Sequence, residues 1–325
     1  MTPAVSVVIP TYRRPALLAG CLEALMHQQG IAHSYEILVC DDGPDEATQG
    51  VATAYAARAA ARGVRLTYIA VVGTQGPAAA RNRGWRAARA PVIAFTDDDT
   101  VPSRGWLAAG LAALARWDAW AIAGRIEVPV PPEATDYERN TAELERTEFA
   151  TANCFVRRSA LERIGGFDER FTAAWREDSD LQFSLLRAGG KVMRTDSALV
   201  VHPVRPAPWG VSISQVRKSH FDALLYKKHA DYYRTRIAAT PWNYYLIVAA
   251  LAAAVLAALV GRPGIGAAAG TLWLILTLAF AAKRLRATSL KPAHVAEMLW
   301  TSIVIPPLAV AWRLYGACKF RVAFF

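Results

Sequence analysis

The chain has 325 residues and a formal net charge of +10, and its length exceeds the roughly 100–200 residues of a typical single domain. Residues 1–202 hold 22 Lys and Arg against 24 Asp and Glu, whereas residues 203–325 hold 15 against 3. A segment that is both basic and apolar fits an anionic membrane surface, and no DNA- or RNA-binding motif is present. We therefore expect a globular domain followed by a membrane part, and no nucleic-acid partner.

The first hundred residues alternate between strand and helix patterns. Such alternation predicts parallel βαβ units with right-handed crossovers and a ligand site at the carboxyl ends of the strands. Neither GxGxxG nor GxxxxGK[ST] occurs, which argues against a dinucleotide-binding dehydrogenase and a P-loop NTPase. The predicted strands are Val5–Ile9 (ended by Pro10), Glu36–Cys40, Arg65–Val71 and Val92–Phe95, and the predicted helices are Pro15–Gln28, Asp45–Arg62 and Gly76–Ala88.

Polar residues follow three of these strands. Pro10-Thr11-Tyr12 follows the first, Asp41-Asp42-Gly43 the second, and the triplet Asp97-Asp98-Asp99 the fourth. Three adjacent carboxylates repel one another, so a cation should hold them together, and oxygen ligands suit Mg²⁺ or Mn²⁺. A solvated acidic turn is the alternative for the triplet alone. With Arg81 on the third helix, this edge contains the groups that a nucleoside and a metal-bound diphosphate need.

Several segments together carry a family resemblance. SVVIPTYRRP (6–15), CDDG (40–43), ARNRG (80–84) and TDDD (96–99) resemble family 2 glycosyltransferases of the GT-A fold. The resemblance continues through residues 155–161, 164–169 and 177–181, so that it covers about residues 3–205. It implies an α/β GT-A catalytic domain over residues 1–205, with a Rossmann-like, mostly parallel sheet. It also implies metal-dependent sugar transfer with inversion.

The resemblance assigns roles to residues of the donor site. It implies that Asp42 binds the base and that Arg81 reaches the diphosphate or the base. The DxD motif maps onto Asp97 and Asp99, with Asp99 as a metal ligand and Asp97 contacting the ribose or the metal. The register within the triplet is ambiguous, so Asp98 stays a candidate for nucleotide binding. The turn expected to pack on the nucleoside is Pro10, Thr11 and Tyr12.

The second half of the domain supplies the expected base. Asp178 of the pair Glu177-Asp178 resembles the general base that takes the proton of the acceptor hydroxyl. The alternative is that both carboxylates merely favour a helix N-terminus. His202 resembles a third metal ligand, although a lone histidine is often structural. The residues expected near the acceptor and the donor sugar are Gly166, Phe167 and Glu177.

The C-terminal part reads as a helical membrane module. Residues 242–260 and 265–282 contain no charge and each suffices for a membrane span. Basic residues flank the open ends of this hairpin, which places those ends in the cytoplasm. Residues 206–240 predict amphipathic interfacial helices, and residues 241–325 the transmembrane hairpin with a further apolar segment. That segment, 295–312, is predicted to be re-entrant or interfacial, with a third span as the alternative.

The predicted function is transfer of a sugar from a nucleotide-diphosphate sugar, UDP favoured, to a hydroxyl acceptor. The acceptor would be a lipid-linked or membrane-bound glycan of a cell-envelope polysaccharide pathway. No signal peptide precedes the first strand, so we expect a multi-pass protein of the inner membrane with a cytoplasmic catalytic domain. Two alternatives stay open: a polyprenyl-phosphate glycosyltransferase, and a non-catalytic sugar-nucleotide-binding subunit of a polysaccharide export system.

Overall fold

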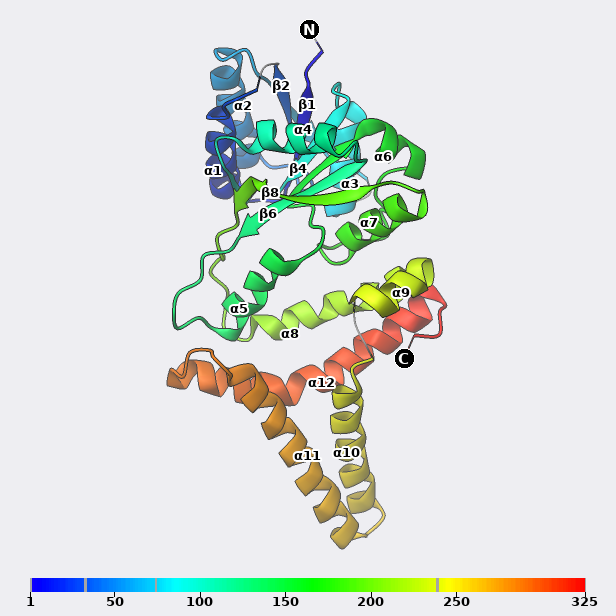
Figure 1. Ribbon diagram of the computed structural model, residues 1–325. Helices are drawn as coiled ribbons and strands as arrows, with labels where there is room; N and C mark the ends of the chain where they lie inside the picture. Colours follow the sequence, from blue (N-terminus) through cyan, green and yellow to red (C-terminus); the bar gives the residue numbers. More distant parts are fainter. Residues whose placement is uncertain (1, 32–33, 74, 238–239, 325) are drawn as a thin grey trace. The chain divides into compact units, whose positions relative to one another are not determined.

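The computed structural model describes residues 2–31, 34–73, 75–237 and 240–324, which form two compact units (Figure 1). The first unit contains the chain up to Pro129 together with Ala142–Val204. The second contains Val130–Thr141 together with the chain from Arg205 onward. Val130–Thr141 thus groups with the C-terminal helices, whereas the sequence analysis placed it inside the N-terminal domain. The chain therefore passes between the units three times.

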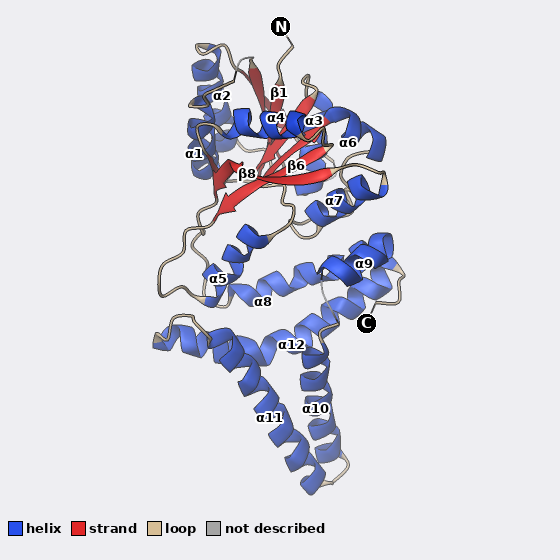
Figure 2. Ribbon diagram, in the orientation of Figure 1, coloured by secondary structure: helices blue, strands red, loops and turns tan. Residues whose placement is uncertain are grey.

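The first unit is built on one mixed sheet (Figure 2). Its strand order is β3-β2-β1-β4-β7-β6-β8-β5. Neighbours among β3, β2, β1 and β4 are parallel, as are β6 and β8. Strand β7 is antiparallel to both of its neighbours, and β5 is antiparallel to β8. The predicted α/β class with a mostly parallel sheet is confirmed. The strands are Val5–Thr11 (β1), Tyr35–Asp41 (β2), Arg65–Ala70 (β3), Val92–Thr96 (β4), Val101–Pro102 (β5), Ala121–Glu127 (β6), Asn153–Arg157 (β7) and Val192–Val201 (β8).

Strand β1 continues through Pro10 to Thr11, so the prediction that Pro10 ends it was wrong. Its pairing with β4 stops at Val8, whereas its pairing with β2 continues to Thr11. A proline has no N–H to donate, but beyond Val8 the β4 side of the strand requires no donor. The extra residues carry Thr11 to the edge where the acidic triplet lies.

Side chains of the central strands alternate between two apolar layers, as the period of two in a strand requires. Val7 and Ile9 of β1 pack in the layer formed with α1, α2 and α4, whereas Val8 packs in the layer with α3, α6 and α7. This double burial explains why the strands are almost continuously apolar. The helices are Pro15–Met26 (α1), Glu46–Ala60 (α2), Pro77–Ala87 (α3), Trp106–Arg116 (α4), Arg158–Ile164 (α6) and Glu177–Arg187 (α7), with a 3₁₀ turn at Glu143–Arg146 (η1).

The second unit is helical (Figure 2). Its helices α10, α11 and α12 are long and apolar enough to cross a membrane, by length and composition. Helices α10 and α11 match the two predicted spans. The helices are Asp136–Ala142 (α5, which ends in the first unit), Val211–Val216 (α8), Phe221–Tyr232 (α9), Trp242–Leu259 (α10), Pro263–Leu285 (α11) and Pro292–Phe320 (α12), with short helical turns at Arg217–His220 (η2) and Tyr233–Ile237 (η3).

Helix α12 differs from the re-entrant segment predicted for residues 295–312. A re-entrant segment turns back on itself, but α12 is one helix of 29 residues that contains Pro306 and Pro307 in its interior. Proline removes a helix hydrogen bond without necessarily ending the helix. The continuous helix agrees with the alternatives of an interfacial helix or a third span, and both stay predictions.

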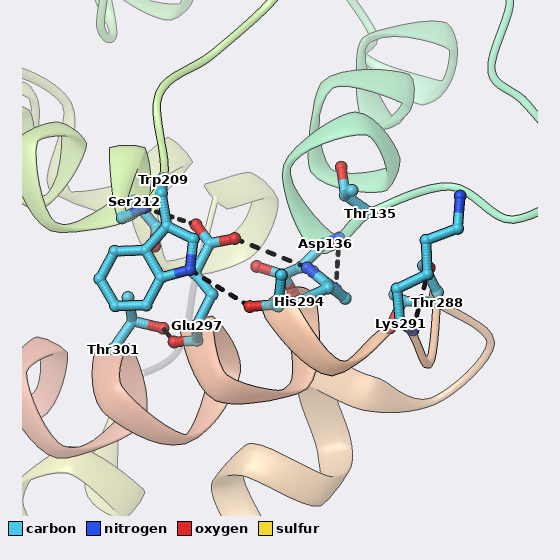
Figure 3. A network of polar contacts seen from close by, with 12 residues as sticks. Thr135, Asp136, Trp209, Ser212, Thr288, Lys291, His294, Glu297 and Thr301 are labelled. Atoms are coloured by element: carbon cyan, nitrogen blue, oxygen red, sulfur yellow. Dashed lines mark hydrogen bonds and ion pairs between the residues drawn. The ribbon is translucent and has the colours of Figure 1, made fainter.

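A polar network joins Val130–Thr141 to the helices of the second unit (Figure 3). The backbone N–H of Asp136 donates to His294 Nε2 over 3.3 Å. The backbone N–H of Gly210 donates to Glu297 Oε1 over 2.7 Å, so α12 contacts two separate segments of this unit. A backbone group that leaves water needs such a partner. The network therefore accounts for the grouping of Val130–Thr141 with the helices.

Replacing Asp136 with alanine should lower the free energy of unfolding by about 3 kcal/mol, because it removes the ion-pair partner of the largely buried Arg284 and leaves it hydrogen-bonded to the neutral hydroxyl of Thr301. Arg284 donates to Asp136 Oδ2 over 2.7 Å, and the two side chains are only 9% and 23% exposed. Thermal unfolding of the detergent-purified protein measures the change. The control is Glu133→Ala, because Glu133 and Lys291 lie 4.0 Å apart and are each 75% exposed, and such surface pairs contribute little. Equal losses in both variants would contradict the prediction.

Candidate active site

Three side chains of the types that bind metal ions converge at the carboxyl edge of the sheet. Asp97, Asp99 and His202 each offer one ligand atom, and these atoms all lie within 4.8 Å of one another. His202 Nε2 is 3.4 Å from Asp99 Oδ1. His202 is buried, and its Nδ1 has no hydrogen-bond partner among the described residues. Two carboxylates and an imidazole with an unused buried nitrogen form a donor set that suits a divalent cation such as Mn²⁺ or Mg²⁺.

Strand pairing brings His202 to the acidic triplet from far along the chain. Strand β5 follows the triplet directly, and its Val101 pairs with Val201 at the end of β8. On the other side of β8, the N–H of His202 donates to the carbonyl of Glu127 over 2.7 Å. The histidine is therefore held by backbone bonds on a rigid strand end, which is a precise way to place a ligand.

The middle residue of the triplet points to a different set of partners. Asp98 accepts hydrogen bonds from Thr11 Oγ1 at 2.8 Å and from Arg14 Nη1 at 3.1 Å. Burial raises the pKa of Asp98 to about 6, although the Arg14 guanidinium opposes the rise. Arg14 also lies 3.9 Å from Asp99. Arg14, which the sequence analysis did not single out, thus supplies part of the positive charge that three carboxylates require.

The ends of β1 and β2 place the residues expected at the nucleoside. Both carboxylate oxygens of Asp42 accept from the backbone N–H of Gly76, each over 2.8 Å, just before α3 begins. Burial raises the pKa of Asp42, whereas the Gly76 hydrogen bond lowers it. Tyr12 is 48% exposed, and its ring packs so closely on Gly43 that a Cβ there would come within 2.4 Å of it. The exposed ring of Tyr12 can stack on a base, and the half-buried carboxylate of Asp42 can hydrogen-bond to that base.

Arg81, Glu177 and Asp178 form the opposite part of the site. Arg81 donates to Asp97 Oδ1 over 2.7 Å and to Glu177 Oε1 over 3.2 Å, and it is buried. Burial raises the pKa of Glu177, and Asp178 adds to the rise while Arg81 opposes it. Burial also raises the pKa of Asp178, against the hydrogen bond from the Ser179 N–H. A carboxylate with a raised pKa is a stronger proton acceptor.

Gly166 and Phe167 lie beneath the site. Gly166 has φ +80°, and a Cβ there would come within 2.6 Å of the side chains of Asn82 and Trp85. Phe167 is buried and packs edge-on against Phe95, with ring centroids 5.3 Å apart. Both residues therefore pack against the interior of the first unit, and their expected place near the acceptor stays a prediction. Asn82, next to Arg81 in the ARNRG segment, was not predicted; it bonds both the N–H and the carbonyl of Phe167.

Comparison with known protein families shows which family the chain belongs to. The model of the family described as "Glycosyl transferase family 2" matches residues 6–171, half of the chain. The chain belongs to glycosyltransferase family 2. A second model, described as "Glycosyl transferase family group 2", matches residues 135–312 and so extends over the apolar helices. The resemblance stated from the motifs is therefore confirmed.

Known family 2 relatives match over part of their length. A validoxylamine A glucosyltransferase of Streptomyces hygroscopicus subsp. jinggangensis is 29% identical over 222 residues, which cover 56% of this chain and 51% of that protein. The chain thus spans about half the length of this relative. The glycosyltransferase AglE of Haloferax volcanii is 27% identical over 219 residues, which cover 63% of this chain and 68% of AglE.

A solved structure shows the same fold. A mannosyltransferase from Pyrobaculum calidifontis, solved in complex with GDP-Man and Mn²⁺, has a TM-score of 0.58 and 20% sequence identity. The match covers 97% of this chain and 88% of that protein. The GT-A fold with C-terminal helices, expected from the motifs, is confirmed. At 20% sequence identity, the structural similarity shows the fold and does not identify the substrate.

Proposed function

We propose that this family 2 protein transfers a sugar from a nucleoside-diphosphate sugar, UDP favoured, to a hydroxyl of a lipid-linked or membrane-bound glycan. Transfer would invert the anomeric carbon and require Mn²⁺ or Mg²⁺. The observation that carries this proposal is the convergence of Asp97, Asp99 and His202 within 4.8 Å. A cation held at such a site would stabilise the negative charge that develops on a diphosphate leaving group in the transition state.

The donor would lie across the ends of β1, β2 and β4. Tyr12, with Pro10 and Thr11 in the same turn, would pack on the nucleoside, and Asp42 would accept a hydrogen bond from the base. Asp97, Asp99 and His202 would hold the divalent cation, which when bound neutralises negative charge on the diphosphate. Asp98 would position Thr11 against the nucleotide, because the Asp98 carboxylate accepts a hydrogen bond from Thr11 Oγ1.

Asp178 is the proposed general base. It would accept the proton of the acceptor hydroxyl while the bond from that oxygen to the anomeric carbon forms. The bond from the anomeric carbon to the diphosphate oxygen breaks on the opposite face, so one displacement inverts the centre. The raised pKa of Asp178, caused mainly by desolvation, and its position in the first turn of α7 support this role. A sugar hydroxyl is a weak nucleophile until its proton leaves.

We further propose that the protein is a multi-pass protein of the inner membrane with its catalytic domain in the cytoplasm. Three long apolar helices support membrane association. Basic residues precede α10 at Arg234 and Arg236 and end α11 at Lys283 and Arg284. Basic residues at both open ends of a helical hairpin favour the cytoplasmic side for those ends.

Donor hydrolysis by the detergent-purified protein tests the proposal. A panel of UDP-, GDP- and dTDP-sugars is assayed with Mn²⁺, Mg²⁺ or EDTA. We expect metal-dependent release of one nucleoside diphosphate from one class of donor. The absence of turnover of any donor by a folded protein would contradict the proposal. Binding of a donor without turnover would favour the non-catalytic sugar-nucleotide-binding subunit.

A further inference from the structure

One buried guanidinium connects the two halves of the site. Arg81 on α3 is 2% exposed. Its Nη2 donates to Asp97 at the end of β4, and its Nη1 donates to Glu177 at the start of α7, 96 residues further along the chain. Its Nε is buried as well. The side chain is 3% exposed, so little of it can reach a donor diphosphate without a rearrangement.

The surroundings of Arg81 hold it in place. The guanidinium carbon lies 5.9 Å from the centre of the Phe167 ring, within reach of a cation–π interaction. Phe167 is itself fixed by Asn82, which accepts from its N–H over 2.9 Å and donates to its carbonyl over 2.9 Å. Consecutive residues of the ARNRG segment thus provide the bridge and its support.

We propose that Arg81 is a positioning residue that holds Asp97 and Glu177 at a fixed separation and does not contact the donor. This inference rests on the proposed function, because Asp97 belongs to the proposed cation site and Glu177 precedes the proposed base, Asp178. By fixing Glu177, Arg81 fixes the first turn of α7 and with it the direction of the Asp178 carboxylate. A planar guanidinium can bond two carboxylates in set directions, which a lysine ammonium cannot reproduce.

Three measurements on Arg81→Lys should give different results. Transfer should slow about 10- to 100-fold, because a small misplacement of reacting groups costs that much. Mn²⁺ affinity, measured by paramagnetic resonance of the free ion without nucleotide, should fall about tenfold, as for loss of an outer partner of a metal ligand. The Kd of UDP or GDP at saturating Mn²⁺ should change less than about threefold, since no donor contact is lost.

A double-mutant cycle with Glu177→Ala completes the test. Both single variants should slow transfer, and the double variant should be no slower than the worse of the two, because both remove one linkage. Arg58→Lys, which alters an exposed pair with Glu23, is the matched control and should behave as wild type.

Two results would overturn the inference. One is a rise in the Kd of the nucleoside diphosphate as large as the loss in transfer, which would mean that Arg81 contacts the donor. The other is unchanged transfer in Glu177→Ala, which decides the matter even if the Arg81 variants do not fold. Failure of the wild-type protein to turn over any donor would instead refute the proposed function, and the Mn²⁺ titration would still test whether Arg81 positions Asp97.

Discussion

Replacing Asp178 with asparagine should lower the rate of sugar transfer about 10²- to 10⁴-fold, the usual contribution of general base catalysis. The amide keeps the size of the side chain and can still accept the 2.7 Å hydrogen bond from the Ser179 N–H. It cannot accept a proton from the acceptor hydroxyl. Binding of the nucleoside diphosphate should be unchanged, so the loss should appear in kcat and not in the donor Kd.

The same variant separates the proposed reaction from transfer to a polyprenyl phosphate. A phosphate oxygen is already ionised and needs no base, so Asp178→Asn would spare much of that activity. The control is Glu162→Gln, which alters a 56% exposed carboxylate paired with Arg158 and should leave both rates unchanged. Substantial transfer to a hydroxyl acceptor by Asp178→Asn would contradict the role of this residue.

Replacing Asp99 with asparagine should reduce metal-dependent donor hydrolysis at least about 100-fold, because charge stabilisation by a bound cation contributes several kcal/mol. Asp99 is 7% exposed and faces both His202 and Arg14, and the amide of asparagine would not supply the negative charge of this carboxylate. Titration of Mn²⁺ followed by paramagnetic resonance should show a matching loss of affinity.

Asp98→Asn is the matched comparison within the triplet. Its side chain bonds Thr11 and Arg14 and lies outside the cluster of Asp97, Asp99 and His202. Mn²⁺ binding should therefore fall much less than in Asp99→Asn. Equal losses of Mn²⁺ affinity in the two variants would mean that Asp98 is itself a ligand.

Local patterns were sufficient to predict strands β1 to β4 and helices α1 to α3 of the first unit. The apolar runs at Val5–Ile9 and Val92–Phe95 are buried on both faces of the sheet, and such a run has few alternatives to a central strand. Pro10 misled the prediction because local sequence does not reveal which strand edges need a donor. The residue at which a strand ends therefore depends on its pairing with neighbouring strands.

The candidate site, like the fold, was predicted in part from the sequence and depends in part on contacts between distant segments. The family resemblance implied roles for Asp42, Asp97, Asp99, Asp178 and His202. The convergence of His202 with Asp97 and Asp99 depends on the antiparallel pairing of β5 with β8, which is a long-range contact. The opposite direction of Asp98, and the bridge from Arg81 to Glu177, also arise between segments far apart in the chain.

The amino-acid sequence by itself determined the family, the alternation of strands and helices and the apolar C-terminal helices, because these are properties of local composition, period and motif. Only the tertiary structure decided which carboxylates lie together with His202, where the arginine charges lie, and that Val130–Thr141 groups with the C-terminal helices. Those outcomes depend on strand register and on which polar groups are buried together. Both are set by the packing of segments distant in sequence.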